Sequence, residues 1–473
     1  MTGKPSAPDG PTGQLATWAA ELTLDDIPVT IRERAKHLLL DGFGCALIGA
    51  QLPWSRTAVE AVLEFEGIGT APIIGWGRSL NAPAAALLNS TLIQGFELDD
   101  FHPLAPLHSN SVVIPALLAA ASNTPEVDGA SVLVAAVAGF EVGPRVGLAL
   151  NGSEMLSRGW HSGPVFGTHA SAAAVGNLVD LDASEMEDAL GLAATQSGGL
   201  MAAQFGAMSK RMQHGFAARN GLYAALLARR GYTGIKQVYE QPYGGFLSTF
   251  GEGHRPDASQ ISAELGERWE TERIVIKPYA AMGGLHAALD ALFDIASQRS
   301  LVAEEIDHID VEVSHAVYHH GWWTPERPLT PTAAQMNIGY ALAVGVLDGA
   351  ALIEQYAPSR IDADDVWALL PRIAAHHNET FDRLGATGRG QTRLEIRFTD
   401  GTSLESSQFA AKSVLTPLTN DEVLAKYRQL SARVLDPTRQ ARVERLVLSL
   451  DELPDLSGLV DALAGPVTSP FDS

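Results

Sequence analysis

Residues 273–279 read Arg-Ile-Val-Ile-Lys-Pro-Tyr, and they divide the chain into two parts with different patterns. Before them, from about residue 15, apolar residues recur at helical spacing, Ala and Leu dominate, and alternating strand patterns are hard to find. This pattern predicts an all-helical domain over residues 15–271. The run Arg273–Ile276 is itself β-like and opens the second part of the chain.

The second part mixes strand and helix patterns. Residues 308–314 alternate strictly between apolar and polar side chains, and residues 393–398 do so again before an Asp400-Gly401 turn into 403–406. Helical patterns over 281–297 and 332–348 lie between them. We therefore predict a smaller α+β domain over residues 272–412.

The two ends of the chain complete the prediction. Thr419-x-x-Glu422 is a capping box, so residues 413–473 should form helices that return to the first domain. Residues 1–14 are rich in Pro, Gly, Ser and Thr and are predicted to be disordered, without the apolar core of a signal peptide. The expected fold is mainly α, a large all-helical domain with an inserted smaller α+β domain.

The composition excludes several classes of protein. The 473 residues include 33 Lys+Arg, 55 Asp+Glu and a single cysteine, Cys45, which gives a formal net charge of -22. We expect no nucleic-acid partner and no docking on anionic lipid, because both need basic surface. One thiol cannot hold an iron–sulfur cluster, a cysteine-ligated zinc or a disulfide framework. The expectation is an acidic cytoplasmic protein.

Three long stretches carry no charged side chain: residues 103–125, 159–179 and 190–209. Each is long enough to span a membrane, but each is interrupted by Pro, Gly or polar residues. We interpret them as buried helices with their connections and expect no membrane segment.

Titratable residues cluster beside these uncharged stretches. Residues 96–109 contain Glu97, Asp99, Asp100, His102 and His108 between two apolar helical patterns. A solvated loop would have the same composition. Burial at the edge of a core would instead move carboxylate and imidazole pKa values toward neutrality, as general acid–base chemistry requires.

A second cluster places His161 between Gly159 and Gly163 at the start of an alanine-rich helix. A histidine in such a setting is often structural, but the flanking glycines permit close approach of a ligand. A third cluster, residues 209–219, holds Lys210, Arg211 and His214 at helical spacing, which indicates an anion site or a helix with ordinary ion pairs.

The fourth cluster contains Lys277 and Tyr279 at the predicted domain junction, where ligand sites are common. The pairs His319-His320 and His376-His377 have no carboxylates and histidines near them at the spacing of a metal site, and we interpret them as surface residues. Together the four clusters predict a site for a small polycarboxylate, with Lys and Arg holding carboxylates and His, Asp and Glu moving protons. No feature demands a metal or an organic cofactor.

The same clusters, in this order, resemble the MmgE/PrpD family over nearly the whole chain. Within it, the chain is similar to the fungal cis-aconitate decarboxylases that form itaconate. The motifs that carry the resemblance are ELDD (97–100) with APLHS (105–109), GWH (159–161), KRMQHGFAARNG (210–221), YGGF (243–246), IKPY (276–279), and RPLT (327–330) with QM (335–336).

The resemblance implies a helical domain with an α+β lid, a homodimer, no metal or cofactor, and a cleft between the domains. His108, His161, Lys210 and Lys277 match family active-site residues. Phe101 stands where animal members carry Thr, and His102 is the residue expected to replace it. The predicted catalytic residues are His161, Lys210, His108, Asp99 and Lys277, and the predicted substrate-binding residues are Glu97, His102, Arg211, His214 and Tyr279.

The implied function is that of a cofactor-free lyase that decarboxylates cis-aconitate to itaconate, with a histidine general acid and lysine carboxylate anchors. A 2-methylcitrate or alkylcitrate dehydratase and a dicarboxylate epimerase remain alternatives, since they need almost the same site. The third hypothesis is a non-catalytic helical protein that binds other proteins.

Overall fold

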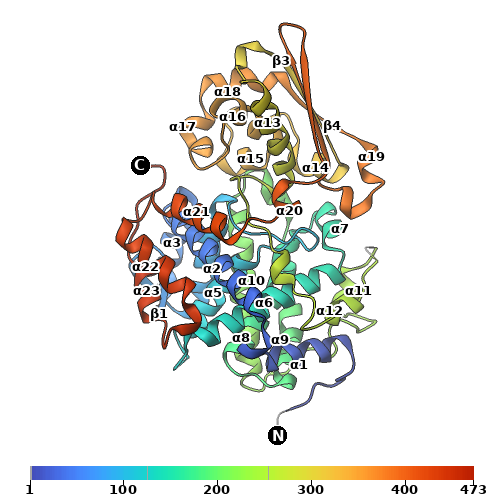
Figure 1. Ribbon diagram of the computed structural model, residues 1–473. Helices are drawn as coiled ribbons and strands as arrows, with labels where there is room; N and C mark the ends of the chain where they lie inside the picture. The colour runs from blue at the N-terminus through green and yellow to red at the C-terminus, as the bar shows by residue number, and fades with distance from the viewer. Residues whose placement is uncertain (1–2, 125, 254, 473) are drawn as a thin grey trace.

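The computed structural model describes residues 3–124, 126–253 and 255–472, without the side chains of 386 and 387. Figure 1 shows a helical body and, above it, a smaller domain built on a sheet. The expected class, mainly α with a smaller α+β part, is confirmed.

At the centre of the body, α10 (Ser209–Ala228) packs by its buried side against helices that are apolar on nearly every side: α4 (Ala82–Ile93), α5 (Ser109–Ala121), α6 (Gly129–Ala149) and α8 (Ser162–Leu178). Such helices are stable only when covered all round. Within the described chain, only α6 is long and apolar enough to cross a membrane. Of its apolar 18-residue stretch, 94% is buried inside the protein.

Further helices surround this centre: α1 (Pro11–Glu21), α2 (Val29–Gly49), α3 (Pro53–Phe65), α7 (Gly152–Ser157), α9 (Ala183–Ala194), α11 (Phe246–Phe250) and α12 (Ser259–Ser262). A two-stranded hairpin of β1 (Ile68–Ile73) and β2 (Arg78–Leu80) also belongs to the body. The sequence analysis missed this hairpin because its strands are short and irregular, with a register shift after Ile68.

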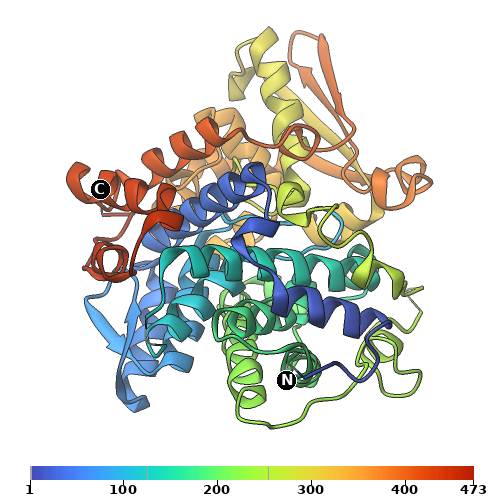
Figure 2. The ribbon, with the colours of Figure 1, turned by 60° about the horizontal axis from the view of Figure 1, so that its bottom comes forward.

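The prediction that residues 1–14 are disordered is wrong for residues 3–14. The backbone N–H groups of Gly3 and Ser6 donate to carboxylates of Asp182 and Glu187, and α1 already begins at Pro11. Figure 2 shows this N-terminal segment lying along the helical body. The composition suggested disorder, but carboxylates far along the chain supply partners for its backbone.

The smaller domain, called the lid below, contains a four-stranded sheet in the order β4-β3-β5-β6. Only β3 and β4 are parallel. Helices α13 and α16 contact the sheet. The elements of the lid are α13 (His286–Gln298), β3 (Ile306–Val313), α14 (His315–Gly321), α15 (Pro331–Met336), α16 (Ile338–Asp348), α17 (Pro358–Ile361), α18 (Asp364–Leu369), β4 (Ile373–His377), α19 (Glu379–Asp382), β5 (Thr392–Phe398) and β6 (Ser403–Gln408).

The alternating patterns in the lid are confirmed as β3 and as the β5–β6 hairpin, and Ile309, Val311 and Val313 are buried. The β-like run Arg273–Ile276 is not a strand of the sheet. Its first residue, Arg273, ends a short 3-10 helix (Glu270–Arg273), and its Val275 makes a single bridge to Phe101 in the body. No second pair of residues extends that bridge, so the apolar run serves as a crossing between domains.

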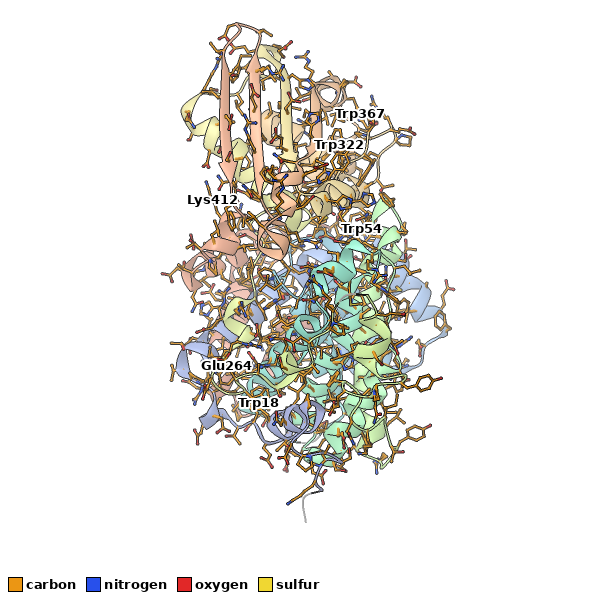
Figure 3. The ribbon with its side chains drawn as sticks, turned by 90° about the vertical axis from the view of Figure 1, so that its right-hand side faces the viewer. Trp18, Trp54, Glu264, Trp322, Trp367 and Lys412 are labelled. Carbon is orange, nitrogen blue, oxygen red and sulfur yellow. The ribbon has the colours of Figure 1, made fainter. Side chains whose placement is uncertain are left out.

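After the lid, α20 (Lys412–Leu415), α21 (Asn420–Ser431), α22 (Pro437–Leu448) and α23 (Ser457–Ala464) follow, and α21 and α22 pack against α2. The capping box of Thr419 and Glu422 begins α21. Lys426 Nζ lies 2.7 Å from the buried Asp41 carboxylate, which fixes α21 on the body. Figure 3 shows Lys412 at the boundary between the lid, marked by Trp322 and Trp367, and the body.

Candidate active site

A cavity lies at the junction of the two domains. The body contributes the loop after Phe96, the start of α8 and the start of α10, and the lid contributes α14 and the loop before β5. Polar and charged residues lie among Phe, Met, Val, Leu, Ala, Pro and Gly. The polar lining is formed by Glu97, His102, His108, His161, Ser162, Lys210, Lys277, His320 and Arg389.

The buried carboxylate of Glu97 joins three cations from different parts of the chain. Lys277 Nζ lies 2.8 Å from Oε2, Arg211 Nη1 lies 2.5 Å from Oε1, and Lys210 donates to Oε1 as well. Glu97 itself has left-handed backbone angles, with φ of 55°, directly after the 3-10 helix Gln94–Phe96. This turn ends the helix and places the carboxylate between α10 and the crossing segment.

The cations determine the charge state of this cluster. Burial alone would raise the pKa of Glu97, but Lys210, Lys277 and Arg211 outweigh it and hold that pKa well below its usual range. Burial lowers the pKa of Lys210 to about 8, against the opposing effect of Glu97. At neutral pH the site therefore holds an ionised carboxylate and a lysine close to its own titration.

His108 is held in one tautomer. Its Nδ1 lies 2.7 Å from the backbone carbonyl of Asp100 and 3.2 Å from Asp99 Oδ2. Both oxygens are acceptors, since the pKa of Asp99 is lowered despite its burial, largely by His108. The Nδ1 atom therefore carries the proton, and Nε2 remains as the second nitrogen of a ring that lines the cavity.

His161 and His214 complete a row of imidazoles. The ring of His214 lies 4.9 Å from that of His161 and 5.1 Å from that of His108. His161 Nδ1 and both nitrogens of His214 have no hydrogen-bond partner among the described residues. Burial lowers the pKa of both rings well below the usual value. Lys210 and His108 lower the pKa of His161 further, so both rings are neutral at neutral pH.

Residues 13–259 match the MmgE/PrpD N-terminal domain, and residues 279–452 match the MmgE/PrpD C-terminal domain. The chain belongs to the MmgE/PrpD family.

Three relatives illustrate its place in that family. The cis-aconitate decarboxylase-like protein oryM of Aspergillus oryzae is 44% identical over 98% of this chain and 100% of its own length. The cis-aconitate decarboxylase of Aspergillus terreus is 42% identical over 98% of each chain. The Homo sapiens cis-aconitate decarboxylase is 24% identical over 96% of this chain and 95% of its own. This MmgE/PrpD chain is an enzyme of the carboxy-lyase class.

Two of the predicted substrate-binding residues stand in the cavity wall or beside it, with side chains that bind other residues of the protein. His102 Nδ1 accepts the backbone N–H of Ala105, and Nε2 therefore donates to Glu270 Oε2 at 3.0 Å. Arg211 is fully buried, and besides Glu97 it donates to Gln335 Oε1 at 2.6 Å. His102 thus cannot replace the hydroxyl of the family threonine, because both of its nitrogens are occupied.

Tyr279 is placed elsewhere. Its hydroxyl donates to Asp290 Oδ1 on α13 at 2.9 Å, and its ring packs against His286 and Phe293 inside the lid. Tyr279 is only two residues from Lys277 in the sequence, but the two side chains lie in different environments: that of Lys277 contacts Glu97, and that of Tyr279 packs inside the lid. Tyr279 does not line the cavity.

Sequence reasoning missed three polar residues of the cavity, Ser162, His320 and Arg389. The interpretation of His320 as a surface residue is wrong, because it is 6% exposed and lies on the same side of α14 as the buried Val317. Helical spacing from Val317 separates it from the exposed neighbour His319, and this was the available signal. Arg389 follows a short 3-10 turn and carried no pattern of its own.

The described part of the chain contains no group of three His, Cys, Asp or Glu residues arranged to hold a metal ion. His376 and His377 are exposed and pair with single carboxylates, Asp310 and Asp382.

The Gly42-Phe-Gly44 segment lies in α2, where Gly42 faces Asn110 and Ile114 and Gly44 faces Tyr427. These glycines therefore serve close helix packing.

Proposed function

We propose that this protein decarboxylates cis-aconitate to itaconate. The observation that carries the proposal is the convergence of Glu97, Lys210, Lys277 and His161 on one cavity, in a chain 42% identical to an Aspergillus terreus enzyme named cis-aconitate decarboxylase. A lysine-rich cavity with imidazoles suits a substrate with three carboxylates whose reaction needs one proton.

Binding of the trianion uses cations that are only partly neutralised. Lys210, Arg211 and Lys277 face the two carboxylates of Glu97 and Asp99, so positive charge is in excess. Each ammonium group has three N–H donors, and the contacts to Glu97 and Asp99 leave donors of both lysines available. Lys210 and Lys277 would hold substrate carboxylates while Glu97 holds the lysines.

The chemical step breaks the bond between the methylene carbon and its carboxylate. CO2 leaves, and the electron pair forms a new double bond to the methylene carbon. The former double-bond pair moves to the carbon beside the other terminal carboxylate, where conjugation with that carboxylate stabilises it. The lysines neutralise this developing charge in a site with little water, where electrostatic stabilisation is strongest. One proton then bonds to that carbon and completes itaconate.

His161 is the proposed proton donor. Burial, Lys210 and His108 hold the pKa of His161 well below its usual value. A trianion bound to Lys210 reverses this electrostatic effect and favours the imidazolium form. His161 would therefore take up a proton as substrate binds and deliver it to the carbanion. His108, polarised by Asp99, would adjust the local charge.

The direct test incubates the purified protein with cis-aconitate and separately with 2-methylcitrate, and follows CO2 and products by NMR. Itaconate and CO2 from the first acid support the proposal, and dehydration of the second without decarboxylation of the first would replace it by the dehydratase function. A His161→Asn variant should lose about 100-fold or more in kcat, as loss of a general acid does. Unchanged turnover by that variant would remove His161 from the mechanism.

We also propose a homodimer. Leu200, Phe205, Met208, Phe216 and Tyr223 are exposed by 40–69% on η3 (Met201–Phe205), α10 and the residues beside them. Contiguous exposed apolar side chains of this kind are typical of protein interfaces. The opposite side of α10 carries Lys210 and His214, so a partner chain here would support the helix that positions the site.

A further inference from the structure

His320 and Arg389 stand on the lid side of the active-site cavity and have no role in the chemistry described above. Elsewhere in the same cavity the body contributes Glu97 and Lys210, and the crossing segment contributes Lys277. Figure 1 shows α14, which bears His320, directly above α7 of the body, and the two helices are in contact. Arg389 bridges this gap: its Nη1 donates to the carbonyl oxygen of Ser153 at 2.5 Å and to Ser157 Oγ at 3.3 Å, both on α7.

Arg389 differs from the other cations of the cavity in having no carboxylate. Lys210 and Lys277 both pair with Glu97. Arg389 forms no ion pair within the described residues, and its hydrogen bonds to α7 use Nη1 alone. Burial lowers the pKa of Arg389 to about 10, which leaves it cationic at neutral pH. A half-buried guanidinium without a counter-ion is unfavourable unless a ligand supplies the negative charge.

His320 is the second unsatisfied group. The ring is almost fully buried, and neither nitrogen has a hydrogen-bond partner among the described residues. Burial first, then Arg389, His319 and His315, lower the pKa of His320 to about 4, so the ring is neutral and offers one N–H donor. Ser314, the N-cap of α14, donates its hydroxyl to the Arg389 carbonyl at 2.7 Å and ties the two residues into one lid unit.

We propose that Arg389 and His320 form a second carboxylate subsite on the lid, which binds the end of a polycarboxylate that points away from Glu97 and its lysines. The guanidinium offers the forked donors that carboxylates prefer, and the imidazole N–H adds a third donor. The inference rests on the proposed function, because it assumes that this cavity takes a polycarboxylate. It deepens that function by making the lid a selector for acids with carboxylates at both ends.

The test compares saturated acids that the reaction cannot consume. Tricarballylate has the three carboxylates of cis-aconitate, methylsuccinate lacks one terminal carboxylate, and glutarate lacks the central one. Isothermal titration should give wild-type enzyme a preference for tricarballylate over methylsuccinate or glutarate. In Arg389→Gln the affinity for tricarballylate should fall about 10- to 100-fold, as loss of a charge-assisted hydrogen bond implies, and its preference over methylsuccinate should shrink. The preference over glutarate should stay, because glutarate keeps both terminal carboxylates and loses the same contact.

Three variants separate ligand binding from a structural effect. Arg383→Gln removes an exposed arginine of the same lid segment and should bind like wild type. Ser157→Ala removes one hydrogen bond of Arg389 to α7 while keeping the guanidinium, and should retain the preference. His320→Gln keeps a neutral donor, so it should bind tricarballylate more tightly than His320→Leu does.

Two different failures are distinguishable. If wild type binds tricarballylate but Arg389→Gln keeps the full preference, the lid subsite is refuted and the proposed function stands. If wild type binds none of the three acids and does not turn over cis-aconitate, the proposed function fails and the subsite fails with it. A preference lost equally in Ser157→Ala would mean that Arg389 acts only by holding the lid on α7.

Discussion

Glu97 and Lys277 connect the two domains inside the active-site cavity. Oε2 of Glu97 lies 2.8 Å from Nζ of Lys277, across 180 residues of sequence, and both side chains are almost completely buried. Because Lys210 and Arg211 contact the other oxygen of the same carboxylate, one side chain sets the positions of three cations. The substrate-binding charges are therefore arranged before any substrate enters, and four predictions follow from this geometry and its surroundings.

Replacing Glu97 by Gln should leave three buried cations without their shared anion. Removal of one partner of a buried ion pair costs about 3–5 kcal/mol, so the free energy of unfolding should fall by about that amount. Thermal denaturation with and without tricarballylate measures this, and the acid should raise the Tm of Glu97→Gln more than that of wild type. Glu97→Asp keeps the charge and serves as the control. Equal melting of all three proteins would contradict the assigned role.

The dependence of kcat/KM on pH should report two groups of the free enzyme, after correction for the ionisation of cis-aconitate. His161 must be protonated and its pKa lies well below neutrality, so kcat/KM should fall about tenfold per pH unit above neutral pH. Above about pH 8 Lys210 loses its charge as well, and the slope should double. Lys210→Arg should abolish the second break. A second break near pH 10 in place of the one near pH 8 would contradict the lowered pKa of Lys210.

Gly163→Ala should disturb the row of imidazoles without touching the substrate. A Cβ at this position would lie 2.4 Å from His214 Nε2, and His214 is confined between His108 and His161. We expect kcat/KM to fall at least about tenfold and the free energy of unfolding to fall by about 1–3 kcal/mol, the usual cost of overpacking. Gly198→Ala is the matched control, since nothing lies within 4 Å of its added Cβ. Full activity of Gly163→Ala would mean that His214 does not position its neighbours.

The proposed homodimer predicts that Phe216→Asp yields monomers. Phe216 lies at the centre of the exposed face of α10, lining cavities shared with Leu200 on one side and Tyr223 on the other. Analytical ultracentrifugation of wild type and variant measures the change in mass. Tyr243→Asp alters a residue that is 95% exposed outside this face and should leave the mass unchanged. A wild-type protein that sediments as a monomer at micromolar concentration would refute the proposal.

Several elements were predictable because each depends on neighbours in the sequence. Alternation marked β3 and the β5–β6 hairpin, and the uncharged stretches marked buried helices such as α5 and α8. The titratable clusters at Glu97, His161 and Lys210 were recognisable because charged residues interrupt long apolar runs. The β-like pattern of Arg273–Ile276 did not predict a strand correctly, because β propensity does not say whether a partner strand lies beside the segment.

By itself, then, the sequence determined the division into a helical body and an α+β part, the family, and most of the residues that meet at the site. Tertiary structure alone decided what those residues do there: that Glu97 serves three cations, that both nitrogens of His102 are occupied, that Tyr279 turns into the lid, and that His320 and Arg389 enter the cavity. The physical reason is that periodicity reports which side of an element is apolar. The partner of each polar atom depends instead on packing between segments far apart in the chain.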